Sequence, residues 1–202
     1  MIRLAIVEDH PAIADGLGAL LRDEPDIEVV ASVADGAAAE RAIVAMHPDV
    51  VLCDLLLGDG SDGFDLMERM VPGPRFVILS AYSLPSYYRR AMDAGVAGFV
   101  SKTAPVEVIV GAIRTAASGG TTFTKEARHA ARSALQRPSG REGEIVRLVA
   151  EGLSNAEIAE RLGLRLKTVE SQLRRLFDRY DVASRTRLVR VAEQQGWLGL
   201  DP

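Results

Sequence analysis

Five side chains with carboxylate, hydroxyl or ammonium groups follow short apolar segments in the first half of the chain. They are Glu8, Asp9, Asp54, Ser80 and Lys102. The run VVLCD at residues 50–54 shows the pattern most clearly, because four apolar residues suited to a protein interior end in the carboxylate of Asp54. A carboxylate in that place needs a chemical explanation.

If the apolar segments are neighbouring parallel strands, these five groups meet at one edge of a sheet, where open α/β folds bind their ligands. Three carboxylates at close range repel one another unless a cation lies between them, and oxygen ligands suit Mg²⁺. The hydroxyl of Ser80 and the ammonium of Lys102 can then donate to further oxygens of a phosphoryl group. The pattern predicts that Asp54 is the reacting group.

The elements that must position these groups are visible as periodicity over residues 1–122. Short β-rich segments are expected to be strands at residues 3–7, 28–33, 50–53, 76–79 and 98–100. They alternate with amphipathic segments, expected to be helices at residues 12–21, 36–46, 64–70, 86–94 and 106–117. Five strands alternating with five helices predict a parallel sheet covered on both faces, because each parallel connection needs a crossover.

Length and composition predict a globular protein of two domains. The chain has 202 residues, of which 48% are hydrophobic and 26% charged. No segment approaches roughly 18 uninterrupted apolar residues, and the amino terminus turns acidic at Glu8, so neither a membrane span nor a secretory signal is expected. A cytoplasmic location follows. The single cysteine, Cys53, is expected to be a small buried apolar residue.

The net charge of −4 is unevenly distributed along the chain. Residues 1–122 carry −8, residues 123–137 carry +3, and residues 138–202 carry +1, which restores the total of −4. Within the last part, residues 165–187 carry +4, from 7 basic and 3 acidic side chains. This is a modest basic patch of the kind that can contact phosphates.

Residues 1 to about 120 resemble the receiver domain of bacterial two-component response regulators, a flavodoxin-like (βα)5 fold. The resemblance rests on the acid pair after the first strand, an aspartate 45 residues later, a serine 26 beyond that, and a lysine 22 further on. It implies that Asp54 accepts a phosphoryl group from a histidine kinase. It also implies a Mg²⁺ site formed by Glu8, Asp9, Asp54 and the backbone carbonyl of Leu56. Ser80 and Lys102 would contact the phosphate, and Phe99 would move with Ser80 as the switch aromatic.

Two positions depart from the receiver pattern. Gly58 stands where a proline is usual, and the loop from there to Asp62 is one residue longer than is common. Thr103 follows Lys102 where many receivers have a proline. Taken singly, each acid could be a helix cap and Lys102 a surface charge, but agreement at four strand ends favours the site. His10 is not expected to be a ligand, since the chain offers no second histidine or cysteine at metal spacing.

Residues 121–137 are expected to be a basic linker whose residues permit a helix. Pro138-Ser139-Gly140 would end such a helix. A second, all-α domain is expected at residues 138–202, with helices at 142–151, 155–162, 167–180 and 185–195. Ser154 and Glu157 form the pattern of a capping box, and Gly163 ends the same helix. The second and third helices therefore form a helix-turn-helix, with the third as the reading helix.

Residues 138–198 resemble the LuxR-type DNA-binding domain. The resemblance is carried by the motifs Arg141-Glu142, Glu151-Gly152-Leu153-Ser154-Asn155, Glu157-Ile158-Ala159, Leu162, and Lys167-Thr168-Val169-Glu170. Pro138, Gly140 and Gln172 depart from the usual residues of this family. A receiver followed by this domain is the arrangement of NarL/FixJ-type regulators.

The reading helix separates into an apolar and a polar face. Val169, Leu173, Leu176 and Phe177 are expected to face the core. The candidate DNA contacts are the remaining polar residues, which can neutralise phosphates or hydrogen-bond to base edges: Lys167, Thr168, Glu170, Ser171, Gln172, Arg174 and Arg175. The apolar stripe of the last helix, Leu188 to Ala192, suits either pairing of two domains or packing within one.

The sequence as a whole predicts a DNA-binding transcription regulator controlled by phosphorylation of Asp54, and not an enzyme. Its expected partners are a histidine kinase, double-stranded promoter DNA and, when phosphorylated, a second copy of the chain. One alternative is a hydrolase that forms an aspartyl phosphate, although such enzymes commonly carry a second acid where Leu56 stands. Another is a protein-binding regulator that does not use phosphate. Retention of the acid pair, Ser80 and Lys102 argues against the latter.

Overall fold

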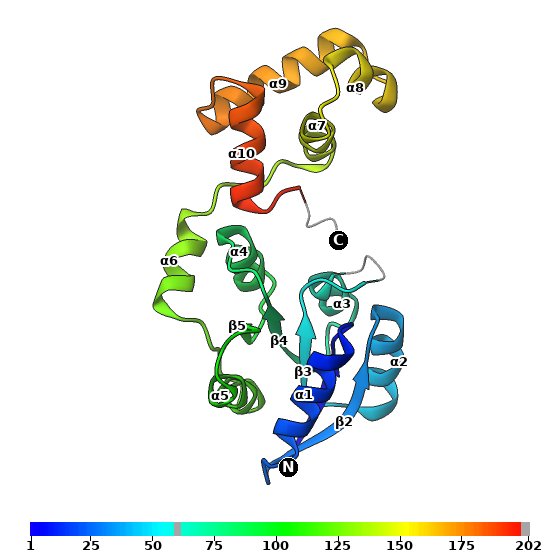
Figure 1. The fold of residues 1–202 in the computed structure, drawn as a ribbon, viewed down its shortest axis with the longest axis vertical. Helices are drawn as coiled ribbons and strands as arrows, with labels where there is room; N and C mark the ends of the chain where they lie inside the picture. Colours follow the sequence, from blue (N-terminus) through cyan, green and yellow to red (C-terminus); the bar gives the residue numbers. More distant parts are fainter. Residues whose placement is uncertain (59–61, 199–202) are drawn as a thin grey trace. The chain divides into compact units, whose positions relative to one another are not determined.

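The computed structural model describes residues 1–58 and 62–198 and divides the chain into two compact units (Figure 1). One consists mainly of residues 1–129 and the other mainly of residues 130–202. Among the described residues, no helix combines the length and the apolar character needed to cross a membrane.

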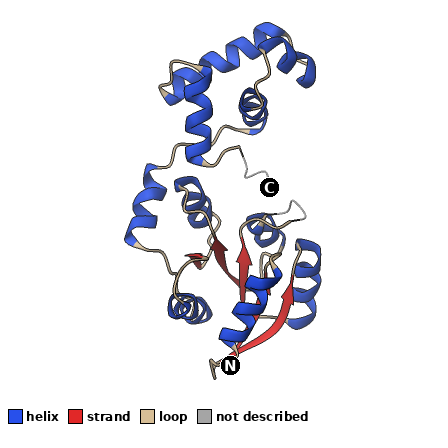
Figure 2. Cartoon of the chain, in the orientation of Figure 1, coloured by secondary structure: helices blue, strands red, loops and turns tan. Residues whose placement is uncertain are grey.

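The first unit contains a five-stranded parallel sheet with the strand order β2-β1-β3-β4-β5 (Figure 2). Its strands are β1 (Ile2–Val7), β2 (Ile27–Val33), β3 (Val50–Asp54), β4 (Arg75–Ser80) and β5 (Gly98–Ser101). β1 pairs with β2 on one side and with β3 on the other, and β4 and β5 follow β3 in the order of the sequence. The predicted (βα)5 fold is confirmed, with strand ends within two residues of those expected.

Helices cover both faces of this sheet because the inner strands are apolar on both faces. They are α1 (Pro11–Leu21), α2 (Gly36–Met46), α3 (Gly63–Arg69), α4 (Pro85–Asp93) and α5 (Val106–Ala117). On one face, residues of α1 and α5 form a core with alternate residues of the strands: Leu4, Ile6, Leu17, Leu21, Val50, Leu52, Val77, Leu79, Ile109 and Ile113. This packing fixes the strand ends that carry the polar groups.

The end of β3 is closely packed against the start of α3. A Cβ atom added at Gly63, the first residue of α3, would lie 2.6 Å from the backbone oxygen of Asp54 and 3.0 Å from Cys53 Sγ. Only glycine fits without moving the strand end. The Cys53 side chain is fully buried, as expected of a small apolar residue, and burial raises the pKa of its thiol.

Residues 121–137, expected to be a linker, contain one further helix, α6 (Lys125–Ser133). Just before it, the backbone of Thr122 pairs with the edge strand β5. Thr122 N donates to Ala97 O at 2.6 Å, and Phe99 N donates to Thr122 O at 3.3 Å. The segment that leaves α5 is therefore attached to the sheet before α6 begins.

The described residues of the second unit that follow α6 form four helices: α7 (Gly140–Ala150), α8 (Asn155–Leu162), α9 (Leu166–Tyr180) and α10 (Arg185–Gln195). All four contribute to one core, whose members include Ile145, Val149, Ile158, Val169, Leu173, Leu176, Leu188, Ala192 and Trp197. Ser154 and Glu157 form the predicted capping box at the start of α8. Gly163 ends α8 with a φ of 63°, a left-handed conformation that favours glycine.

An ion pair joins α7 to α9. Arg179 donates to both carboxylate oxygens of Glu142, at 2.8 and 2.9 Å. Glu142 also accepts from Ser139 in the capping box at the start of α7. The hydrogen bonds from Arg179 hold the pKa of the Glu142 carboxyl below its ordinary value of 4.5. A carboxyl whose pKa is lowered on folding stabilises the folded state above its unfolded pKa, and this contribution disappears as the pH falls.

We predict that Glu142→Gln lowers the free energy of unfolding of this unit by about 1 kcal/mol at pH 7, because glutamine keeps the capping box but loses the charged pair. The difference from wild type should shrink as the pH falls below 4.5. Urea unfolding followed by the fluorescence of Trp197, the only tryptophan and a buried member of this core, measures the unit selectively.

Arg179→Gln serves as the matched control and should cost a similar free energy. The double variant should be little worse than either single one, since both remove the same interaction. A difference between wild type and Glu142→Gln that stays constant from pH 7 to pH 4 would contradict the assignment.

Candidate functional site

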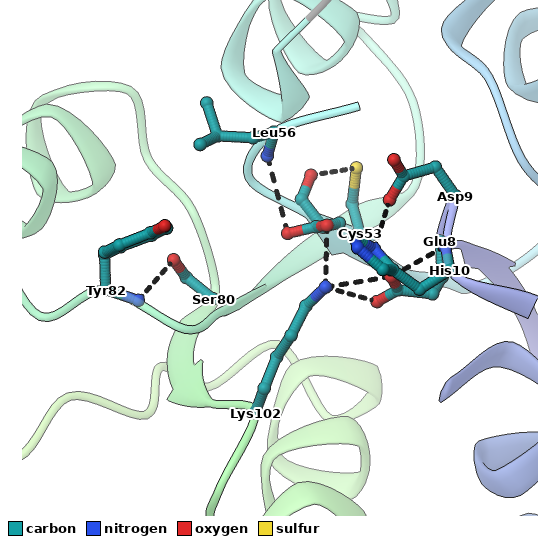
Figure 3. A network of polar contacts seen from close by, with 9 residues as sticks. Glu8, Asp9, His10, Cys53, Leu56, Ser80, Tyr82 and Lys102 are labelled. Carbon is teal, nitrogen blue, oxygen red and sulfur yellow. Dashed lines mark hydrogen bonds and ion pairs between the residues drawn. The ribbon is translucent and has the colours of Figure 1, made fainter. Parts of the chain in front are cut away.

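The five polar groups predicted from the strand ends gather at the carboxyl edge of the sheet (Figure 3). Asp54 is the last residue of β3, and Ser80 is the last residue of β4. Glu8 and Asp9 follow β1 directly, and Lys102 follows β5. The parallel topology brings together residues that lie up to 94 positions apart in the chain.

Lys102 connects the two most buried acids of this edge. Its Nζ atom donates to Asp54 Oδ2 at 2.7 Å and to Glu8 Oε1 at 2.8 Å. The exposed fraction is 2% for Glu8 and 6% for Asp54, so both carboxylates are largely removed from water. Charge-assisted hydrogen bonds offset part of the cost of burying these charges.

The acidic groups fit a divalent cation. Ligand atoms of Glu8, Asp9, His10 and Asp54 all lie within 4.8 Å of one another. Glu8 Oε2 is 2.8 Å from Lys102 Nζ, which makes it part of the ion pair. This oxygen is buried, and no described residue donates a hydrogen bond to it. Three ionised carboxylates and one ammonium carry a formal charge of −2, which is the charge that a divalent cation neutralises.

The ionisation of the two central groups is governed by burial and by their mutual contact. Burial raises the pKa of Asp54 above its ordinary value, although the hydrogen bond from Lys102 opposes the change. Burial alone would lower the pKa of Lys102, but its hydrogen bonds to Asp54 and Glu8 raise it overall. Lys102 therefore stays charged, while the Asp54 carboxylate is destabilised by its surroundings.

Two residues outside the predicted set lie beside Asp9. His10 Nδ1 is 2.8 Å from Asp9 Oδ1 and 3.1 Å from Glu8 Oε1. A Cβ atom at Gly58 would come within 2.9 Å of Asp9 Oδ2, so any side chain there would press on this carboxylate. Gly58, which departs from the receiver pattern, therefore leaves room for the Asp9 carboxylate. The rest of the loop between Gly58 and Asp62 lies outside the described residues.

Asp54 is also held by its own loop. Leu56 N approaches Asp54 Oδ1 at 3.4 Å, a long hydrogen bond.

Thr103, the second departure from the receiver pattern, donates its backbone N–H to Ser101 Oγ at 3.2 Å. A proline at position 103 would lack that donor.

Ser80 and Phe99 are both buried, and each contacts a tyrosine. Ser80, with 1% of its surface exposed, accepts a hydrogen bond from the backbone N–H of Tyr82 at 3.1 Å. The ring of Phe99 on β5 meets the ring of Tyr88 on α4 edge to face, with centroids 4.9 Å apart. Tyr88 was not singled out from the sequence, because nothing in its local pattern indicates its contact with β5.

Sequence reasoning also missed an arginine that joins α4 to the loop after Asp54. Arg90 donates to Asp62 at 2.5 Å and to Asp65 at 2.7 Å, and its guanidinium lies 4.6 Å from the centre of the Phe64 ring. Asp62 is the N-cap of α3. Arg90 thus fixes the start of α3 relative to α4.

In the second unit, the apolar and polar faces of α9 are as expected. Val169, Leu173 and Leu176 are buried in the core, and Phe177 packs against it. Of the candidate DNA contacts, Gln172 is half-buried and the other six are exposed: Lys167, Thr168, Glu170, Ser171, Arg174 and Arg175. On α10, Leu188 and Ala192 are buried in the same core, so these two belong to packing within the unit.

Comparison with known proteins agrees with the geometry of both units. Residues 4–114 match the family model described as response regulator receiver domain. Residues 139–192 match the model described as bacterial regulatory proteins, luxR family. The two matches fall on the parallel α/β unit and on the four-helix unit.

Relatives of the whole chain share this arrangement. The transcriptional regulatory protein LiaR of Bacillus subtilis is 33% identical over 92% of this chain and 94% of its own. The crystal structure of the response regulator ChrA, from a heme-sensing two-component system, is 31% identical, with a TM-score of 0.57 over 97% of this chain and 98% of that one. A structure of RcsB from Salmonella typhimurium, 23% identical, has the same fold, with a TM-score of 0.69 over 96% of this chain and 100% of that one.

The chain therefore belongs to the two-component response regulators and is a DNA-binding transcription regulator with a receiver domain and a LuxR-type helix-turn-helix domain.

Proposed function

We propose that Asp54 accepts a phosphoryl group from a histidine kinase and that this modification controls DNA binding by the second domain. The observation that carries the proposal is the position of Lys102, whose ammonium lies between the buried carboxylates of Asp54 and Glu8. A buried aspartate within reach of an ammonium and two further carboxylates is suited to gain and stabilise additional negative charge.

Mg²⁺ is the cation we propose for the acidic cluster, with Glu8, Asp9, Asp54 and the backbone carbonyl of Leu56 as the protein ligands. When bound, the cation neutralises charge and binds a phosphoryl oxygen. A carboxylate oxygen of Asp54 forms the bond to phosphorus as the bond between phosphorus and the kinase imidazole breaks. Burial destabilises the carboxylate that is consumed, and the charge added with the phosphoryl group has to be offset by Lys102 and the cation.

Lys102 and Ser80 are the groups we propose to bind the phosphoryl oxygens of the product. Phosphorylation of Asp54 removes one of the two carboxylates that accept from Lys102, so the N–H that is freed becomes available to the new oxygens. Ser80 lies on the neighbouring strand and carries a hydroxyl donor. Phe99 contacts Tyr88 of α4, so a movement of Phe99 with Ser80 would be transmitted to α4.

In the second domain, α9 is the helix we propose to enter the major groove. Lys167, Arg174 and Arg175 are exposed and suited to phosphates. Thr168, Glu170, Ser171 and Gln172 carry the donors and acceptors that base edges require. We further propose that the phosphorylated protein binds a two-fold DNA site as a homodimer, and that it acts in the cytoplasm, where bacterial DNA lies.

The chain is proposed to be a regulator and not an aspartyl-phosphate hydrolase. In such hydrolases a second acid two residues after the nucleophile assists the reaction, and this chain has Leu56 at that position. Without an acid or base at position 56, nothing in the sequence favours rapid hydrolysis of a phosphorylated Asp54.

The first test concerns the phosphoacceptor. Incubation with a small-molecule phosphodonor such as acetyl phosphate and Mg²⁺ should add one phosphoryl group to Asp54, as seen in intact-mass spectra and located by peptide mapping. Asp54→Ala should remain unlabelled, and a chelator should abolish labelling, since the acids repel an incoming phosphate without the cation. Labelling of Asp54→Ala to the wild-type extent would contradict the assignment.

The second test separates Mg²⁺ binding from switching. Lys102→Ala should bind Mg²⁺ at least as tightly as wild type, because the ammonium that competes for Glu8 and Asp54 is gone. It should nevertheless dimerise poorly after phosphorylation, because the charge-assisted contact to the phosphoryl group is lost. Calorimetry measures the first property and sedimentation velocity the second.

Arg22→Gln, which removes an exposed cation from the same domain, is the control and should behave as wild type in both measurements. If phosphorylated Lys102→Ala dimerises as fully as wild type, Lys102 has no part in the switch.

A further inference from the structure

Helix α6 carries a stripe of positive charge that neither family match includes. The receiver match ends at residue 114 and the LuxR-type match begins at residue 139, so α6 (Lys125–Ser133) lies between them. Its basic residues are Lys125, Arg128 and Arg132, which we call the α6 cationic stripe. All three side chains are exposed.

The spacing of these residues places them on one side of the helix. At 100° per residue, positions 125, 128 and 132 fall within an arc of about 60°. Ala131 and Ala127 lie outside this arc, about 60° and 100° beyond Arg128, and both are 3% exposed. The helix therefore uses small apolar residues for packing and presents its cations to solvent as a continuous row.

The stripe has no ion-pair partner in the described part of the chain. None of the three side chains forms an ion pair or hydrogen bond with another described residue. Glu126 is the only acid on α6. Like charges three and four positions apart on a helix repel one another, so the row is unfavourable for the helix by itself. A polyanionic partner would remove that repulsion.

We propose that the α6 cationic stripe binds the phosphate backbone of the DNA that α9 reads. This inference rests on the DNA-binding role proposed for α9, and it adds a second contacting element that carries no sequence preference, because phosphates are the same at every base pair. The chain then has two functional parts in its DNA contact: α9 reads bases, and α6 adds affinity that depends on salt.

The test compares full-length proteins of equal net charge. The stripe variant combines Lys125→Gln, Arg128→Gln and Arg132→Gln, and glutamine preserves helix propensity. The control variant combines Arg22→Gln, Arg41→Gln and Arg89→Gln, three exposed arginines of the receiver domain. Both variants lower the basic count from 24 to 21 against 28 acids, which changes the net charge from −4 to −7.

Binding is measured by fluorescence anisotropy with acetyl phosphate and Mg²⁺ present. The probes are a duplex selected in vitro from a random pool by the wild-type protein and a shuffled duplex of the same composition. Three phosphate contacts add about 2.7 to the magnitude of the slope of log affinity against log salt concentration. Over the fourfold change from 50 to 200 mM salt, the affinity of wild type should therefore fall by roughly 40-fold more than that of the stripe variant. The change should be equal on both duplexes.

The control variant should keep the wild-type slope. So should a variant that retains the charges, with Lys125→Arg, Arg128→Lys and Arg132→Lys. A stripe variant with the wild-type slope overturns the proposal. So does an unchanged slope accompanied by tighter binding of the unphosphorylated protein, which would mean that the stripe pairs with an acidic protein surface.

A separate variant tests the role of α9, so that the two failures can be told apart. Thr168→Ala, Glu170→Ala and Ser171→Ala together should abolish the preference for the selected duplex over the shuffled one, because these exposed residues are among those proposed to hydrogen-bond to base edges. If that preference survives, the proposed reading by α9 is wrong, whatever the α6 slopes show.

Discussion

The receiver domain depends on the burial of two carboxylates around one ammonium. Glu8 and Asp54 are almost completely removed from water, and Lys102 Nζ lies within 2.8 Å of both. One cation cannot neutralise three neighbouring acids, so the site keeps an excess of negative charge that a divalent cation can remove. β1 and β3, whose ends carry Glu8 and Asp54, are hydrogen-bonded neighbours in the sheet, so these ends cannot separate to relieve the repulsion without breaking that pairing.

This constraint also explains how a small chemical change at Asp54 can reach other elements. Asp54 begins the loop whose later part is held by Arg90 of α4 through Asp62 and Asp65. Phe99, on the strand that leads to Lys102, contacts α4 through Tyr88 and the segment before α6 through the backbone of Thr122. A rearrangement of Lys102 and Ser80 therefore acts on elements that are already joined by hydrogen bonds and ring contacts.

The sequence was sufficient to predict the fold and the residues that gather at the sheet edge, because both follow from topology. Once β1, β3, β4 and β5 are parallel neighbours, Glu8, Asp54, Ser80 and Lys102 must end at the same edge. Contacts between side chains of distant elements were not predictable. The pairs Arg90–Asp62, Tyr88–Phe99 and Arg179–Glu142 depend on how helices pack, and no local periodicity encodes them. The bounds of α6 were also missed, since its alanines and cations are compatible with either helix or linker.

Control of DNA binding by phosphorylation of Asp54 is tested most directly by one measurement. The affinity of the full-length protein for a selected duplex is determined by fluorescence anisotropy at one fixed salt concentration, with and without acetyl phosphate and Mg²⁺, for wild type and Asp54→Asn. The account predicts tighter binding by wild type when the phosphodonor is present and no response from Asp54→Asn. Equal affinity of wild-type protein in both conditions, or an equal gain by Asp54→Asn, would contradict it.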